Sequence, residues 1–356
     1  MLVFKYMPHQ KTPTLSQQAL SSVQTGNLTE AKRLYGQLCQ LNKGNAEAWM
    51  MLGAVNAELG STAEAVSCLK TAIKLKPDFH QAYYNLGNAF RLQGKHQDAL
   101  TCFERAVQIE PTYVDAWKML GGINLVMGKL DEALACCQRV RSMHPHTADA
   151  HLKLGIVFWR SGKDKEAVEC FLKAVELEPR SVQGWHMLSL VYERMEMYSD
   201  VEMCARRTLS VKADFHEAHI VLANSLRAQN RLDEAIDCFH VALKLKPDSA
   251  DLHCSLADVL IQRGKPGAAI VSLKKAIELN PGFVGAINKL GWALYETEDY
   301  VGAIAAYQKV LEIEPESPGT YGNLGIAYHA LGDLVNAEIS LRKSLHLLPD
   351  SPPNFE

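Results

Sequence analysis

The chain has 356 residues with 37 basic and 40 acidic side chains, which gives a formal net charge of −3. This near-neutral balance argues against a general role in binding nucleic acids or membrane surfaces, since both usually require an excess of basic residues. No stretch approaches the roughly 20 apolar residues that span a bilayer, and the short apolar run within residues 1–8 is interrupted by Lys5. We therefore expect a cytoplasmic protein.

A period of 34 residues runs through residues 46–351, which we divide into nine tandem repeats. Small residues recur at one position of the repeat and prolines recur at another, without slippage between the two series. Two independent series with one period indicate a helical solenoid, which also avoids the size limit of a single globular core. The two series are Gly53, Gly87, Gly121, Gly155, Ser189, Ala223, Ala257, Gly291 and Gly325, and Pro77, Pro111, Pro145, Pro179, Ala213, Pro247, Pro281, Pro315 and Pro349.

Each repeat is predicted to contain two helices, and we count positions from the first residue of the repeat, so that Ala46 is position 1. Positions 4, 7, 8 and 11 share one face of the first helix, which must be packed because it carries large apolar residues around the small one. Glycine or asparagine at position 15 is typical of a helix end, although Glu196 and Glu298 depart from this rule. The second helix carries alanine at position 20, an aromatic residue at position 24 in several repeats, and a closing proline at position 32.

The N-terminal part of the chain follows the pattern only in outline. Residues 1–11 are predicted to form a flexible tail, and residues 12–45 a degenerate N-terminal capping repeat. Ala19 takes the small position of this repeat, Gly26 the break and Tyr35 the aromatic position. Terminal repeats of solenoids are atypical because one of their faces meets water.

The repeat at 182–215 breaks the pattern at several core positions. Val201 replaces the usual alanine and needs more space between the helices. Ala205 replaces the aromatic residue and is too small to fill the space that the ring occupies in other repeats. This exchange predicts the loosest helix packing of the array and a hinge. The alternative is that neighbouring side chains absorb the changes.

The last residues resemble the beginning of another repeat. Residues 352–356 are predicted to start a further first helix, with Phe355 at position 4. No polar capping helix follows the last repeat, so part of its leucine-rich end, at Leu345, Leu347 and Leu348, would lie uncovered. Two interpretations follow: the chain is a fragment of a longer protein, or something else covers this end.

Six of the nine cysteines recur at the same 34-residue spacing. Equivalent residues of stacked repeats lie about 10 Å or more apart, which exceeds the roughly 7 Å that a disulfide allows between Cα atoms. We therefore interpret them as reduced, small, buried apolar side chains rather than as a metal or redox array. They are Cys68, Cys102, Cys136, Cys170, Cys204 and Cys238.

No catalytic constellation is found in the sequence, which lacks a phosphate loop, a nucleophile elbow, an HExxH motif and a CxxC pair. His144, His146 and His151 give the nearest approach to a metal pattern, and His216 with His219 gives a second. A metal ion needs three or four converging ligands, which neither pattern supplies. We predict no enzymatic activity, no cofactor and no metal.

The 34-residue period, with small residues, aromatic residues and a closing proline at these positions, resembles the tetratricopeptide repeat over residues 46–351 and more weakly over 12–45. The resemblance implies an all-α fold, a right-handed superhelical solenoid of about ten helix–turn–helix repeats. The wording YYNLGNAF and YGNLGIAY is also similar to the superhelix of O-GlcNAc transferase and related bacterial proteins. Of the asparagine ladder at position 6 of that superhelix, only Asn85 and Asn323 are present.

Positions 2, 5, 6, 9, 12 and 13 of the first helix lie opposite its packed face. The resemblance implies that they line the concave groove of the solenoid. Basic side chains, amides and aromatic rings gather there, and they suit an extended peptide because arginine grips carboxylates and asparagine can pair with a peptide backbone. The alternative is a solvated face with scattered charges. The candidate peptide-binding residues are Tyr84, Asn88, Arg91, Lys118, Lys153, Trp159, Arg160, His186, Arg194, Asn224 and Arg227.

We therefore predict a protein-interaction scaffold that captures an extended, acidic peptide segment of a protein partner in the groove. Two alternatives stay open. The chain is the substrate-recruiting arm of a larger glycosyltransferase or sulfotransferase whose catalytic domain is not in this sequence, or it is a structural assembly module that self-associates through its uncapped C-terminal end.

Overall fold

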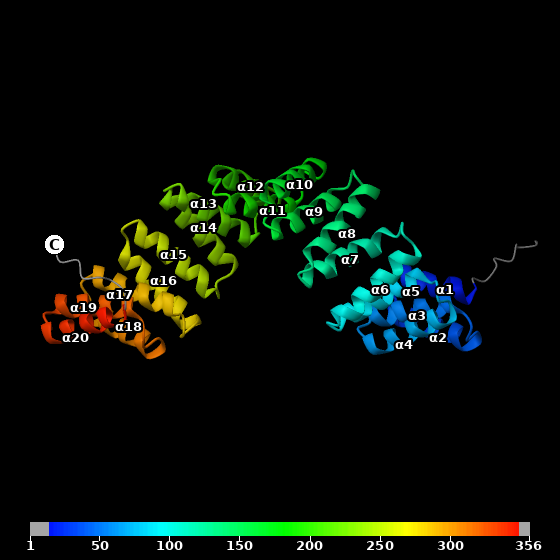
Figure 1. The fold of residues 1–356 in the computed structure, drawn as a ribbon, viewed down its shortest axis with the longest axis horizontal. Helices are drawn as coiled ribbons and strands as arrows, with labels where there is room; N and C mark the ends of the chain where they lie inside the picture. The colour runs from blue at the N-terminus through cyan, green and yellow to red at the C-terminus, as the bar shows by residue number, and fades with distance from the viewer. Residues whose placement is uncertain (1–13, 349–356) are drawn as a thin grey trace, which may run out of the picture. The chain divides into compact units, whose positions relative to one another are not determined.

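The computed structural model describes residues 14–348 (Figure 1). These residues form twenty α-helices and no strand. The all-α solenoid of about ten helix pairs is therefore confirmed over the part of the chain that is described. The predicted tail at residues 1–11 and the predicted further helix at 352–356 lie outside it.

The helices fall into two compact units, the first ending at Leu177 and the second beginning at Glu178. The odd-numbered helices are the first helices of the repeats. Those from α3 to α19 each begin at the first residue of a repeat, as the repeats were numbered from the sequence. The first unit contains α1 (Leu15–Gln24), α2 (Leu28–Leu41), α3 (Ala46–Glu58), α4 (Thr62–Leu75), α5 (His80–Leu92), α6 (His96–Ile109), α7 (Val114–Val126), α8 (Leu130–Met143), α9 (Ala148–Arg160) and α10 (Asp164–Leu177). The second unit contains α11 (Val182–Arg194), α12 (Tyr198–Val211), α13 (His216–Ala228), α14 (Leu232–Leu245), α15 (Ala250–Gln262), α16 (Pro266–Leu279), α17 (Val284–Glu296), α18 (Tyr300–Ile313), α19 (Pro318–Leu331) and α20 (Leu334–His346).

Within each unit the repeats stack in chain order (Figure 1). Every first helix packs against the second helix of its own repeat, and within a unit that second helix packs against the first helix of the next repeat. Gly87 in α5 shows why a small residue is needed at position 8. A Cβ atom at Gly87 would lie only 2.7 Å from Cε1 of Phe103 in α6, whose ring is fully buried. The small residue therefore lets the two helices of a repeat approach each other closely.

The turn between the two helices of each repeat passes through a residue with a left-handed backbone. Most of these residues are glycines, such as Gly94 with a φ of 72°. Glu196 and Glu298 have φ values of 58° and 63°, and Asn230 has 60°. The two glutamates that depart from the sequence rule thus keep the glycine geometry, at a steric cost of about 1–2 kcal/mol each.

A hydrogen bond from position 4 of the first helix ties several repeats to the end of the preceding repeat. Nε1 of Trp117 donates to the carbonyl oxygen of Pro111 at 3.0 Å, and Nε2 of His219 lies 2.9 Å from the carbonyl oxygen of Ala213. A carbonyl only accepts, so the imidazole nitrogen is the donor in this bond. Tryptophan and histidine can replace each other at position 4 because both carry an N–H at the end of a flat side chain. The same bond is made by Trp49, His151, Trp185 and His253.

All nine cysteines are free thiols, and eight of them are buried; Cys238, one of the six at the 34-residue spacing, is only half-buried. Burial raises the pKa of Cys102 and of Cys136 to about 11 in each case. These thiols are therefore neutral and pack as small apolar side chains, as the sequence indicated.

The repeat at 182–215 has a fully buried core in spite of its substitutions. Val201 and Ala205 are both 0% exposed, and Oγ of Ser189 donates a 2.6 Å hydrogen bond to the carbonyl oxygen of His186. The side chains of this repeat are thus buried as deeply as their counterparts in α5 and α6. The hinge stays a prediction.

Candidate functional site

Seven of the eleven predicted peptide-binding residues lie on the first helices α5, α7 and α9 of the first unit. Tyr84 is half-buried, and its ring meets that of Tyr113 edge-on with 5.2 Å between the centroids. Asn88 is half-buried one turn further along α5, and Arg91 is exposed near the end of that helix. Trp159 is half-buried on α9. Tyr84 therefore packs against the residue that leads into α7, whereas Arg91 faces solvent.

The three cations of α7 and α9 differ in how far the protein itself neutralises them. Nζ of Lys118 lies 3.4 Å from the carboxylate of Asp149, so this ion pair joins two adjacent first helices. Arg160 is exposed and donates to the carbonyl oxygen of Leu125 at 3.4 Å. Lys153 is exposed and forms no ion pair with any residue from 14 to 348. Two of the three cations are thus open to an anionic ligand.

A hollow of about 380 Å³ opens between α7 and α9 on this same face. Buried residues, among them Cys137 and Val157, form its floor, and Lys118, Asp149 and Lys153 stand among its lining residues. Burial raises the pKa of the Cys137 thiol to about 12, so the floor carries no charge at neutral pH. The sequence analysis missed this hollow. The sequence feature that could have predicted the hollow is the cysteine at position 24, where the repeats on either side carry phenylalanine.

The other four predicted residues lie on α11 and α13 of the second unit. The ring of His186 meets that of Phe215 edge-on at 5.1 Å, and burial lowers the pKa of this imidazole although Glu217 opposes the shift. His186 is therefore neutral at physiological pH and packs against an aromatic ring. Arg194 is exposed at the end of α11.

Glu193 on α11 occupies the same face as the predicted residues of α13. Burial raises the pKa of this carboxyl, whereas a hydrogen bond from Asn224 and the charge of Arg227 act in the opposite direction. Asn224 and Arg227 thus already face a carboxylate of the protein itself. An incoming acidic ligand would have to compete with Glu193 for them.

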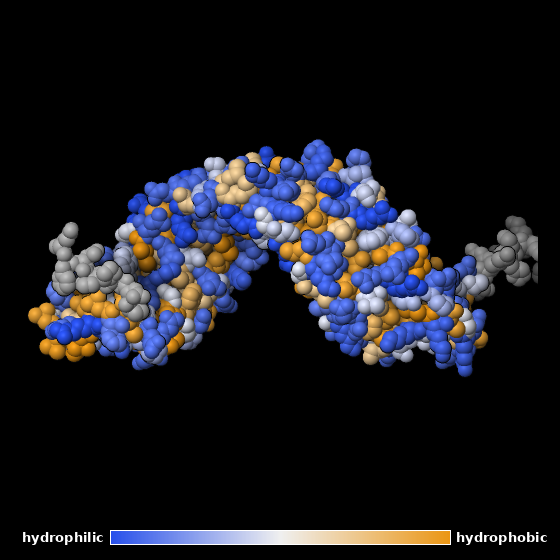
Figure 2. Space-filling view, in the orientation of Figure 1, coloured by the Kyte–Doolittle hydropathy of each residue, from blue (hydrophilic) through white to orange (hydrophobic). Residues whose placement is uncertain are grey.

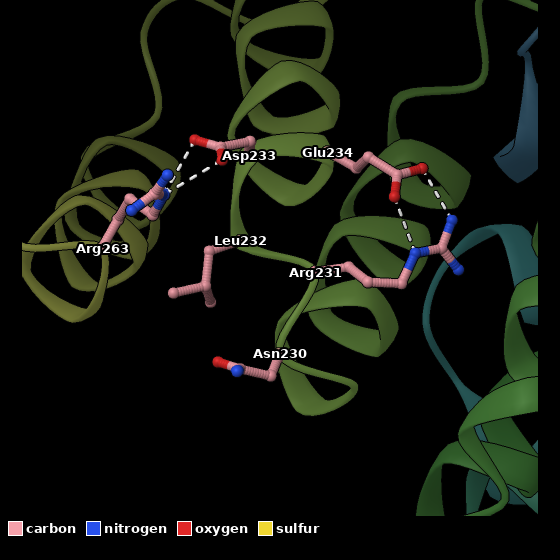
Figure 3. Close-up of a pocket in the computed structure, with 6 residues that line it drawn as sticks. All are labelled: Asn230, Arg231, Leu232, Asp233, Glu234 and Arg263. Atoms are coloured by element: carbon pink, nitrogen blue, oxygen red, sulfur yellow. Dashed lines mark hydrogen bonds and ion pairs between the residues drawn. The ribbon is translucent and has the colours of Figure 1, made fainter.

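A second hollow of about 380 Å³ lies in the second unit, beside the turn between α13 and α14 (Figure 3). Its charges satisfy one another. Arg231 donates to Glu234 through Nε at 2.7 Å and through Nη2 at 2.6 Å, and Nε of Arg263 lies 3.0 Å from the carboxylate of Asp233. Nη1 of Arg231 also donates to Glu202 of α12 at 2.7 Å. The pairs with Glu202 and with Asp233 join successive repeats, so these charges stabilise the structure and are not open to a ligand.

The last described helix, α20, exposes a set of large apolar side chains. Leu345 at position 28 is 69% exposed, whereas Val107 at the same position of α6 is 7% exposed because α7 packs over it. Figure 2 shows the apolar surface that gathers over α19 and α20. The exposure expected for Leu345 and Leu348 is therefore seen. The exposed apolar residues of α20 are Leu334, Val335, Ile339, Leu341 and Leu345.

The histidines of the two metal-like patterns do not converge. His151 and His219 each bond a backbone carbonyl oxygen, and Nδ1 of His216 lies 3.0 Å from Oε2 of Glu217. Between residues 14 and 348, no group of three or more His, Cys, Asp and Glu side chains is placed to hold a metal ion.

Comparison with known protein families agrees with this repeat architecture. Residues 79–286, more than half of the chain, match the model of the cilia and flagella-associated protein 70 C-terminal domain, a tetratricopeptide repeat model. The chain belongs to this tetratricopeptide repeat family. Three further tetratricopeptide repeat models match residues 57–94 with 291–332, residues 16–67, and residues 318–350.

Several solved structures are similar to the chain, and two of them are described as tetratricopeptide repeat proteins. One from Parabacteroides merdae has a TM-score of 0.54 at 17% identity and covers 70% of this chain and 98% of its own, which shows the shared fold. YrrB, described as a protein with an unusual peptide-binding site, has a TM-score of 0.47 at 22% identity over 51% of this chain and 94% of its own. MamA has a TM-score of 0.43 at 28% identity over 46% of this chain and 95% of its own. No curated protein matches the sequence.

The tetratricopeptide repeat assignment is therefore confirmed, and the finer similarity to O-GlcNAc transferase stays a prediction. None of the four family models that match describes a transferase. None of the helices between residues 14 and 348 is both long enough and apolar enough to cross a membrane.

Proposed function

We propose that this tetratricopeptide repeat protein is an interaction scaffold that binds an extended, acidic peptide segment of another protein on the first-helix face of its first unit. The observation that carries the proposal is the state of three exposed cations on α5 and α9. Arg91, Lys153 and Arg160 form no ion pair with any described residue, whereas Lys118 on the same face is engaged with Asp149. An acidic segment would supply the missing partners.

The exposed charges favour the recognition of an acidic ligand more than a high affinity for it. Exposed cations steer an acidic ligand to the face and bind it with an energy that falls as salt rises. Asn88, beside Arg91 on α5, can both donate to and accept from a peptide backbone. His186, Arg194, Asn224 and Arg227 remain candidates for a further stretch of ligand on the second unit, where Glu193 competes for two of them.

A charge reversal on the proposed face tests the proposal. Peptides selected from a random phage-displayed library against the full chain should be rich in Asp and Glu. Their affinity should fall about tenfold or more in the double variant Arg91→Glu with Arg160→Glu, because both contacts turn repulsive. The affinity of the parent protein should also fall as salt is raised.

A matched control separates the position of the charges from the change in net charge. Arg105 on α6 and Arg139 on α8 are also exposed, but they lie on second helices. Arg105→Glu with Arg139→Glu alters the net charge equally and should leave the selected peptides bound. If both double variants bind those peptides as the parent does, the first-helix face is not the binding surface.

A second candidate function, self-association, is favoured by the exposed apolar side chains of α20. Leu334, Val335, Ile339 and Leu345 are each at least 59% exposed, and contiguous apolar surface of this kind marks interaction sites. Light scattering should then give a mass above that of one chain at high concentration, and Ile339→Glu with Leu345→Glu should restore the monomer mass. A parent protein that stays monomeric throughout would rule out this assembly. The recruiting arm of a larger transferase stays an alternative prediction.

A further inference from the structure

The repeat formed by α7 and α8 lacks the large side chain that fills the space between helices in its neighbours. Position 24 carries a fully buried phenylalanine, Phe103 in α6 and Phe171 in α10, but it carries Cys137 in α8. A Cβ atom at Gly155 would lie 2.6 Å from Cε1 of Phe171. One at Gly121 would lie 3.2 Å from Cβ of Cys136 and 3.5 Å from Sγ of Cys137. The short cysteine leaves unfilled the space that an aromatic ring takes in the adjacent repeats.

The hollow of about 380 Å³ between α7 and α9 is this space continued to the surface. Gly122 stands at its edge, at position 9, where other repeats carry Asn88 or Trp292. A Cβ atom at Gly122 would have no heavy atom within 4 Å. Two small residues, Cys137 at the floor and Gly122 at the mouth, thus keep the hollow open. The apolar side chains that line it are Met119, Leu125, Val140, Ala150, Ile156 and Val157.

We propose that this hollow is an anchor pocket for one bulky apolar side chain, phenylalanine or leucine, of an extended peptide that carries an acidic residue beside the anchor. The proposal rests on the proposed function and specifies the ligand of the same face. The volume lies near the lower end of the roughly 300–1,000 Å³ typical of ligand pockets, which suits a single large side chain.

The chemistry of the lining selects the ligand. The thioether of Met119 makes favourable contacts with an aromatic ring, and the neutral thiol of Cys137 adds a small apolar surface at the floor. Lys153 lies close enough to Cys137 for its charge to oppose the rise in the thiol pKa that burial causes, so its ammonium stands near the hollow. Lys153 forms no ion pair with the described residues, and Lys118 shares its charge with Asp149 at 3.4 Å. A carboxylate beside the anchored side chain therefore finds its partner in Lys153.

A small probe tests the pocket apart from the rest of the groove. 3-Phenylpropionate joins a phenyl ring to a carboxylate, 3-phenylpropanol keeps only the ring, and propionate keeps only the charge. Titration of the full chain with each, followed by NMR shifts of the Gly121 and Gly122 amides, should rank 3-phenylpropionate first. Propionate should bind about tenfold more weakly or worse, because it buries no ring. Equal shifts from propionate and 3-phenylpropionate would overturn the proposal.

Two variants close the pocket from opposite ends. Cys137→Phe fills the floor with the residue that the neighbouring repeats carry, and Gly122→Trp covers the mouth with the residue found at position 9 of α17. Each should abolish the 3-phenylpropionate shifts. Cys136→Ala alters the adjacent thiol outside the lining and should preserve them. Circular dichroism verifies the fold of each variant, and Gly122→Trp decides the question if Cys137→Phe fails to fold.

The selected acidic peptides distinguish this proposal from the proposed function. Closing the pocket should weaken peptides that contain Phe or Leu about tenfold and leave those without a bulky apolar residue unchanged. If closure affects neither class while Arg91→Glu with Arg160→Glu still weakens both, the anchor pocket is refuted and the binding face stands. If the charge reversal affects neither class, the binding face itself fails, whatever the probe shows.

Discussion

Replacing Gly155 by alanine tests whether the small residue at position 8 sets the distance between the two helices of a repeat. The added methyl group would lie 2.6 Å from Cε1 and 2.8 Å from Cδ1 of Phe171. The ring is fully buried, so it has no path into solvent and the ring or the helix must shift. Overpacking of this kind costs about 1–3 kcal/mol.

The same substitution also favours the helix, and the two effects have to be weighed. Alanine gains about 1 kcal/mol over glycine in a helix interior. The expected net destabilisation for Gly155→Ala is therefore up to about 2 kcal/mol. Gly122 is the matched control, because a methyl group there meets no heavy atom within 4 Å. Gly122→Ala should stabilise the protein by up to about 1 kcal/mol, so one substitution has opposite signs on α9 and α7.

Urea unfolding followed by far-UV circular dichroism measures both effects as shifts of the unfolding midpoint. A double-mutant cycle identifies their cause, since coupled residues give a non-additive free energy. In a Phe171→Cys background, which copies position 24 of the α7–α8 repeat, Gly155→Ala should lose most of its cost. A Gly155→Ala protein that gains as much stability as Gly122→Ala, or an undiminished cost in the cysteine background, would refute the role of the ring.

Four further predictions concern the turns, the repeat junctions, the groove and the proposed hinge. Trp185→Phe removes the hydrogen bond to the carbonyl of Pro179 and should cost about 1 kcal/mol in urea unfolding. Glu298→Gly relieves a left-handed backbone at a φ of 63° and should stabilise by about 0.5–1 kcal/mol after the entropy of glycine is subtracted. Burial raises the pKa of the Glu193 carboxyl, so the folded state keeps this proton to a higher pH than the unfolded state does. The free energy of unfolding therefore falls as the pH rises from the ordinary pKa of the carboxyl through its raised value in the folded protein. Glu193→Gln should raise the melting temperature at neutral pH and leave it unchanged below that ordinary pKa. Amide hydrogen exchange should be faster in residues 182–215 than in adjacent repeats, and equal protection would remove the hinge.

The sequence was sufficient to predict a regular array of helix pairs. A strict period fixes the register of every repeat once one is assigned, and the first helices from α3 to α19 begin 34 residues apart, from Ala46 to Pro318. The period succeeds because each repeat packs only against its neighbours, so the same local environment recurs along the chain. The two glutamates at position 15 kept the left-handed turn for the same reason, since the flanking helices define that turn.

The sequence analysis did not predict the contacts between repeats. Position 4 looked like a packing site, but six of its residues donate a hydrogen bond to the preceding repeat, and this requirement for an N–H explains the exchange of tryptophan for histidine. The ion pair between Lys118 and Asp149 joins residues 31 positions apart on adjacent helices. The charged residues of the groove could therefore be counted from the sequence. Which of them form ion pairs within the protein could not be predicted from it.

Position 24 links the stability of a repeat to its capacity to bind. A buried phenylalanine there fills the space between helices, and replacing one with a small residue typically costs several kcal/mol. Because a repeat contacts only its neighbours, that loss stays local and the rest of the array can support it. The α7–α8 repeat carries Cys137 at this position and keeps Phe103 and Phe171 on either side. A ligand side chain that enters the hollow would restore the missing packing, so the protein should melt at a higher temperature when 3-phenylpropionate is bound, and Cys137→Phe should show the same stabilisation without any ligand.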